Sequence, residues 1–246
     1  MDRVLYISMS GAKQSDLAIS ASANNMANVG TTGFRSDFNA FRSLPIYGPG
    51  YASRVYAVSE NKGTNLEVGE LISTGRDMDL AVQGDGWITV VTEDGREGYT
   101  RAGDLRALPD GRVVNGQGHS VMGLRGPVVL PPSQKVDIGV DGSISVVPEG
   151  QLPTNIAVID QIKLVNPPPI ELFKDDDGLM RMKNGDVATP DINVKLVSGT
   201  LEGSNVNVVE ALVNMITYSR QFETHVKMMK AAEEMDVATQ QMMRIS

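Results

Sequence analysis

The side chains that most often carry covalent chemistry are scarce in this chain of 246 residues. It has no cysteine, which excludes thiolate nucleophiles, disulfides and cysteine-ligated zinc. Its two histidines are His119, in a glycine-rich turn, and His225, near the C-terminus. A serine nucleophile would need one of them as its base, and the sequence around Ser120 lacks the second glycine of a nucleophile elbow. We therefore expect no catalytic residue and no enzymatic activity.

Two further motifs suggest a ligand but fail on spacing. The Asp-Asp-Asp-Gly segment at 175–178 lacks the alternating acidic positions of a calcium loop, and Asn184 stands where that loop needs its glutamate. The Gly-x-Gly segments at 84–86 and 116–118 complete no phosphate-binding motif and open no helix. We expect no metal site and no cofactor.

Charge and hydrophobicity narrow the class of partner. The formal net charge of −8 repels the phosphates of nucleic acids and anionic membranes. No stretch approaches the roughly 20 apolar residues that span a bilayer, and the apolar run at 4–7 is too short for the core of a signal peptide. We expect no nucleic-acid partner, no direct membrane insertion and no cleaved export signal.

The two ends of the chain have the pattern of long helices that need a partner helix. Residues 3–28 contain no proline, and residues 204–245 contain neither glycine nor proline. Asn207, with Glu210 three residues later, predicts the start of the second helix. Apolar or small residues recur at three- and four-residue spacing, as in a coiled coil. These stripe residues, predicted to form subunit interfaces, are Leu5, Met9, Ala12, Ile19, Ala23 and Met26 in the first helix and Leu212, Met215, Phe222, Val226, Met229, Met235 and Met242 in the second.

The middle of the chain is predicted to be an antiparallel β-domain, a sandwich or a partial barrel. Asp-Gly pairs between β-branched runs signal hairpins, on the argument that both turn positions need a positive φ. The three clearest hairpins are 87–92 with 99–101, 105–108 with 112–115, and 137–140 with 143–147.

The predicted fold class is α+β, with long N- and C-terminal helices forming an antiparallel coiled-coil-like pair and a central antiparallel β-domain. The expected boundaries are 1–34 for the first helix, 35–70 for an extended connecting arm with a possible strand at 54–58, 71–200 for the β-domain and 201–246 for the last helix. In this pairing Ala12 should face Val226. The small domain cannot cover both stripes, so we expect packing on neighbouring copies, as in a filament or tube. A fibre or adhesin stalk is the alternative class, although such stalks usually trimerise in parallel through one stripe.

Three segments together resemble the flagellar rod and hook protein family. Residues 22–35 are similar to its N-terminal signature, with Met26 in place of the usual leucine and Arg35 in place of the commoner lysine. Residues 79–103 resemble the start of the shared β-domain, and residues 203–223 the C-terminal signature. The signature residues are Asn24, Asn25, Ala27, Asn28, Thr32, Gly33, Phe34, Ser204, Asn205, Val206, Asn207, Glu210 and Arg220.

The resemblance implies a structural subunit of the flagellar basal-body rod. Its terminal helices would form the inner layer of a tube that transmits torque and conducts exported subunits, with the β-domain outside. The implied partners are other copies of the chain, the rod proteins FlgB, FlgC and FlgG, and the flagellar type III export apparatus. The implied location is the periplasmic part of the basal body. The length, the segments 9–14 and 45–51, and Trp87 favour a proximal-rod member, with the distal-rod protein FlgG or a hook-type relative as the alternative.

Overall fold

The computed structural model describes residues 2–46, 54–148 and 157–245. These residues form two compact units. The first unit contains Met1–Val29, Ser36–Asn65 and Val206–Ser246, and the second contains Gly30–Arg35 and Leu66–Asn205. Helices occupy the first unit and antiparallel sheets fill the second, which confirms the predicted α+β class.

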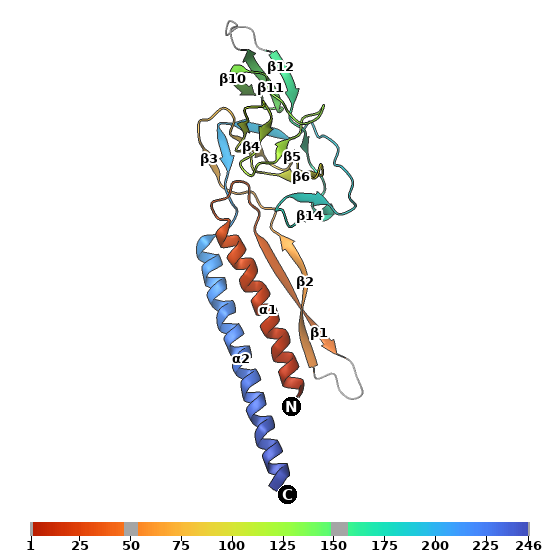
Figure 1. The fold of residues 1–246 in the computed structure, drawn as a ribbon, viewed down its shortest axis with the longest axis vertical. Helices are drawn as coiled ribbons and strands as arrows, with labels where there is room; N and C mark the ends of the chain where they lie inside the picture. The colour runs from red at the N-terminus through yellow and green to blue at the C-terminus, as the bar shows by residue number, and fades with distance from the viewer. Residues whose placement is uncertain (1, 47–53, 149–156, 246) are drawn as a thin grey trace. The chain divides into compact units, whose positions relative to one another are not determined.

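The first unit is built on two helices that lie side by side and run in opposite directions (Figure 1), α1 (Asp2–Ala27) and α2 (Val208–Ile245). Contact is close because α1 buries mainly small side chains; the buried residues of α1 are Ser8, Ala12, Ser15, Ala18 and Ser22. The ring of His225 lies over Gly11, where an added Cβ would be 2.4 Å from it. Gly11 therefore faces His225, so each helix pairs one residue earlier than in the expected pairing of Ala12 with Val226.

A two-stranded antiparallel ribbon completes the first unit. Strands β1 (Asp37–Ile46) and β2 (Arg54–Thr64) pair with a bulge between Ala40 and Phe41, and the ribbon lies along α1 (Figure 1). We expected a connecting arm here, with a strand only at 54–58. The longer pairing was not predicted because β1 lacks a regular alternation of apolar and polar residues and contains Pro45, which a two-stranded edge tolerates. Most of the segment 45–51 lies outside the described residues.

The second unit consists of short antiparallel strands in several small sheets. The largest has the order β14-β15-β6-β5-β9-β8-β7, with β13 also pairing with β5; the others are β10-β11-β12, β16-β4 and β17-β3. The strands are β3 (Leu71–Ser73), β4 (Leu80–Gln83), β5 (Trp87–Val91), β6 (Glu97–Thr100), β7 (Arg106–Ala107), β8 (Val113–Val114), β9 (Ser120–Val121), β10 (Ser133–Ile138), β11 (Ser143–Pro148), β12 (Ala157–Gln161), β13 (Leu164–Val165), β14 (Leu172–Lys174), β15 (Met180–Met182), β16 (Lys195–Ser198) and β17 (Thr200–Glu202). A short 3-10 helix, η1 (Pro169–Glu171), precedes β14.

All three predicted hairpins form, but their turns differ from the expected kind. Gly142 has a φ of 83°, whereas among the described residues no side-chain-bearing residue has a positive φ, so Asp141 does not adopt one. The Gly142 amide donates to the Gly139 carbonyl at 2.9 Å, and the Gly139 amide donates to the Ser143 carbonyl at 2.8 Å. This is a type I turn closed by a left-handed glycine, which needs only one residue with positive φ.

Two apolar clusters hold the second unit together. The larger brings β4, β5, β9, β11 and β16 together through residues such as Leu80, Ile88 and Ile144. The smaller centres on Trp87 and Tyr99. No helix in the described part of the chain is long and apolar enough to cross a membrane.

Asn207 caps the start of α2, as the sequence predicted. Its Oδ1 accepts hydrogen bonds from the backbone amides of Val209 and Glu210 at 3.0 and 3.2 Å. Replacing the cap by alanine, Asn207→Ala, should lower the free energy of unfolding by about 1 kcal/mol, because two helix-end amides lose their acceptor. Urea unfolding followed by helical circular dichroism measures this.

The matched control is Asn207→Asp, which keeps the acceptor and should change the unfolding free energy by less than about 0.5 kcal/mol. Equal stability of the alanine and aspartate variants would show that the cap does not stabilise the helix.

Candidate functional site

The residues that first suggested chemistry have local structural contacts. His119 belongs to a turn in which its backbone amide donates to Asn115 Oδ1 at 2.9 Å. In the acidic turn, the Arg181 guanidinium pairs with both Asp175 and Asp177. The described residues hold no group of three side chains placed to bind a metal ion.

Three fully buried charged side chains of the second unit meet at Glu202, at the end of β17. Its side chain is 0% exposed and pairs with two arginines, Arg35 at 2.5 Å and Arg101 at 3.0 Å. The Gly69 amide also donates to Glu202 Oε1 at 3.0 Å. The two guanidinium carbons lie 5.7 and 5.3 Å from the centre of the Trp87 ring. We call Glu202, Arg35, Arg101 and Trp87 the arginine clamp.

The electrostatics of the arginine clamp make it sensitive to loss of its single carboxylate. Burial lowers the pKa of Arg101, an effect opposed by the negative charge of Glu202 and reinforced by the positive charge of Arg35. The Nε atoms of both arginines are buried and have no hydrogen-bond partner among the described residues. Two buried cations therefore depend on one anion and on the face of Trp87.

The clamp fixes the short segment 30–35 that follows α1. The Gly33 amide donates to the Glu202 carbonyl at 2.7 Å, and a Cβ on Gly33 would lie 2.3 Å from the carbonyl carbon of Arg101. The Lys174 ammonium lies 4.0 Å from the centre of the Phe34 ring and donates to the Arg35 carbonyl at 2.8 Å. The segment 33–35 is thus fixed by contacts with Glu202, Arg101 and Lys174.

The asparagines of the two signatures bind backbone groups. In the first unit, Asn25 donates to the Asp37 carbonyl at 2.7 Å and accepts from the Asp37 amide at 2.8 Å, which fixes the start of β1 beside α1. Asn28 donates to the Asn24 carbonyl at 2.9 Å at the end of α1. In the second unit, Asn205 donates to the Glu67 carbonyl at 3.0 Å. The other signature residues are half-buried or exposed; they are Asn24, Ala27, Thr32, Ser204, Val206, Glu210 and Arg220.

The predicted stripe residues differ widely in exposure. Only Ala12 is fully buried within the chain. The half-buried members are Leu5, Ile19, Met26, Met215, Val226 and Met229. The exposed members are Met9, Ala23, Leu212, Phe222, Met235 and Met242. The two helices therefore leave about half of the predicted stripe exposed, and its role as a subunit interface stays a prediction.

The partners of Arg35 are not predicted from the sequence. Arg101 lies in the segment 79–103 that resembles the family, and Glu202 is not among the predicted site residues. The signal that could have found Glu202 is that it is the one charged residue in the segment 196–209, just before the C-terminal signature. A buried strand end retains a charge only when a counter-charge is present.

Family models match three stretches of the chain. A model described as "Flagella basal body rod protein" matches residues 5–35. One described as "Flagellar hook protein FlgE/F/G D1 domain" matches residues 81–146, and one described as "Flagellar basal body rod FlgEFG protein C-terminal" matches residues 197–242. Arg35 lies in the segment matched at 5–35, and its partner Glu202 lies in the segment matched at 197–242.

Similar curated proteins cover the whole chain. The flagellar basal-body rod protein FlgF of Salmonella typhimurium is 36% identical over 252 residues, covering 100% of both chains. FlgF of Escherichia coli is 35% identical over 240 residues and 95% of both chains. The rod protein FlgG of Bacillus subtilis is 29% identical over 95% of this chain and 96% of its own.

The arginine clamp predicts a large cost for removing its anion. Glu202→Gln keeps the size of the side chain but leaves two buried guanidinium groups without a counter-charge, so it should lower the free energy of unfolding by about 3–5 kcal/mol. Urea unfolding followed by Trp87 fluorescence reports this directly, since the two guanidinium carbons lie 5.7 and 5.3 Å from the centre of its ring.

The control is Asp94→Asn, which breaks an exposed ion pair with Arg96 and should cost less than about 1 kcal/mol. A Glu202→Gln loss as small as that of the control would rule out the clamp as a major source of stability.

Two glycines next to the clamp give a second matched comparison. Gly33 has a φ of 66° and no room for a Cβ, so Gly33→Ala should lower the unfolding free energy by more than about 1 kcal/mol. Gly30 has open space around it and no positive φ, so Gly30→Ala should change stability by no more than about 0.5 kcal/mol. The close packing described at Gly33 would be refuted by equal midpoints of urea unfolding for the two variants.

Proposed function

Because this chain belongs to the flagellar basal-body rod protein family, we propose that it is a structural subunit of the rod, incorporated through its terminal helices. The observation that carries the proposal is similarity over the whole chain to rod proteins, with most of each terminal helix inside a segment matched by a family model. The finer assignment to the proximal rod rests on the FlgF names of those relatives.

The surface of α2 supports incorporation by helix packing. Apolar side chains are exposed on several sides of this helix rather than on the single predicted stripe; they include Val209, Leu212, Val213, Ile216, Met228, Met235, Val237, Met242 and Met243. Exposed apolar side chains that gather on a surface often mark a site of protein–protein contact. Neighbouring subunits in a tube wall would cover such side chains from more than one direction.

The arginine clamp supports the transmission of torque. A drive shaft transmits force through the chain of each subunit as well as between subunits. The segments 30–35 and 200–205 are the parts of the second unit next to the helices in the sequence, and buried ion pairs hold both to one point. This arrangement suits segments that must resist pulling and twisting.

We infer that the partners are other copies of this chain and the rod proteins FlgB, FlgC and FlgG, reached in the periplasmic space through the type III export apparatus. No catalytic role is proposed, because the contacts of His119 are those of a turn and the family is structural. The fibre or adhesin alternative is disfavoured by the antiparallel pairing of α1 with α2 inside one chain.

Polar substitutions on α2 test the proposal. Leu212→Gln together with Met235→Gln keeps good helix formers in place but removes apolar area from exposed positions. Burying one such side chain contributes about 1.5–3 kcal/mol, so losing two contacts should reduce incorporation into the rod at least tenfold. Swimming in soft agar and the amount of the chain in purified basal bodies measure this in a strain that lacks the wild-type gene.

Lys227→Gln with Lys230→Gln is the matched control on the same helix, and it should swim normally. Normal incorporation of the first variant would contradict assembly through α2. Absence of the wild-type chain from basal bodies would contradict the rod function itself.

A further inference from the structure

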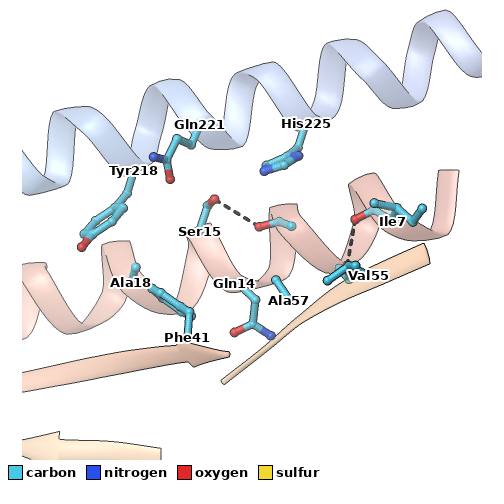
Figure 2. A pocket seen from close by; sticks show the side chains of 12 residues that line it. Ile7, Gln14, Ser15, Ala18, Phe41, Val55, Ala57, Tyr218, Gln221 and His225 are labelled. Carbon is cyan, nitrogen blue, oxygen red and sulfur yellow. Dashed lines mark hydrogen bonds between the residues drawn. The ribbon is translucent and has the colours of Figure 1, made fainter. Parts of the chain in front are cut away.

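A cavity of about 290 Å³ lies in the first unit among α1, α2 and the ribbon. Figure 2 shows Tyr218, Gln221 and His225 reaching from α2 towards α1, with Phe41 and Val55 on the ribbon side of α1. Space remains between them because the residues of α1 at this place are small; they are Gly11, Ser15 and Ala18. The other lining residues are Ile7, Ser10, Gln14 and Ala57.

The residues that line the cavity indicate which kind of group could bind there. Most of it is apolar, and none of its residues is acidic, lysine or arginine. Ser10 and Ser15 donate to carbonyls of their own helix at 2.8 and 3.1 Å. By contrast, Gln14 Oε1 and His225 Nδ1 are buried without a hydrogen-bond partner among the described residues. Buried polar atoms normally have a partner, so the expected occupant is uncharged, mostly apolar and able to hydrogen-bond.

The C-terminal end of α2 has this chemistry and is left without a cover. Since Gly11 lies against His225 and both helices rise 1.5 Å per residue, α2 extends about ten residues past the start of α1. Residues 237–243 of this end carry no charge and include Gln240, Gln241, Met242 and Met243. Met242 and Met243 are each 67% exposed. Met side chains fill irregular cavities well, and Gln side chains supply both a donor and an acceptor.

We propose that the cavity receives side chains from the C-terminal end of the last helix of a neighbouring rod-family subunit. The inference rests on the proposed rod function and identifies one contact between neighbouring subunits of the rod. The family model for this helix covers residues 197–242, and relatives named FlgF and FlgG both match over nearly the whole chain, so neighbours of the same family have an equivalent helix. An uncharged Gln- and Met-bearing helix end complements the apolar walls and the unpartnered atoms of Gln14 and His225.

Photo-crosslinking in assembled basal bodies tests this contact. Gln221 is exposed at the cavity and is the position for p-benzoylphenylalanine; Glu223, exposed on the opposite face of α2, is the control position. After irradiation, mass spectrometry should identify a peptide from the C-terminal end of a rod-family helix joined to position 221 but not to position 223. A probe at 221 that is incorporated yet joins another segment, or none, overturns the inference while leaving the rod function intact.

A filling variant keeps the inference testable if the probe prevents incorporation. Ala57 lines the cavity and is half-buried, so Ala57→Leu should reduce incorporation at least tenfold without changing the circular dichroism of the free subunit. Ala107→Leu, on the exposed strand β7, should leave incorporation unchanged. Equal incorporation of both variants would overturn the inference. Absence of the wild-type chain from basal bodies would instead overturn the rod function, and the inference with it.

Discussion

The connecting segments of the second unit meet at one buried carboxylate, that of Glu202. Glu202 accepts from Arg35, Arg101 and the Gly69 amide, and so joins three segments that are far apart in the sequence. Arg101 also donates to the Gly84 carbonyl at 2.8 Å, which brings the turn before Trp87 into the same network. An apolar cluster could stabilise these segments equally well, but charged groups with fixed hydrogen-bond geometry accept few alternative arrangements. For a subunit under mechanical load, one defined conformation of the connecting segments is the more useful property.

The helix pair differs from this charged network. The side chains buried on α1 are small, and many large apolar side chains of α2 are exposed. Ser8, Ser15 and Ser22 are buried on α1, so little of the chain's apolar area is used in holding α1 to α2. The larger side chains of α2 remain available at the surface. Small residues allow two backbones to approach closely, whereas large exposed side chains form contacts only when another molecule is present. We therefore propose that the first unit gains much of its stability on assembly.

The fold class, the start of the last helix and the three hairpins could be predicted because each depends on local signals. Asn207 bonds to amides two and three residues away, and Gly142 closes a turn with residues next to it. The full length of the ribbon could not be predicted, because its strands have no clear alternation and the start of β1 is held by a contact between Asn25 and Asp37 on different elements. The Arg35–Glu202 pair spans 167 positions, and no local pattern encodes such a separation.

The predicted stripe shows the same limit. Periodicity identified residues on the helices that must be covered, but it did not show which ones α1 and α2 cover for each other. Gly11 opposite His225 decides the register, and a glycine carries no apolar signal. We therefore propose that Leu212 and Met235, which are exposed, contact neighbouring subunits rather than form the seam between the two helices.

The central claim is that the exposed apolar surface of α2 is buried between subunits of the rod. A cryo-electron microscopy map of basal bodies purified from the source bacterium tests it most directly. The account predicts density for this chain within the rod, with α1 and α2 in the tube wall and with Leu212, Met235 and Met242 in contact with neighbouring subunits. A rod without this chain, or one in which these three side chains face solvent, would contradict the account.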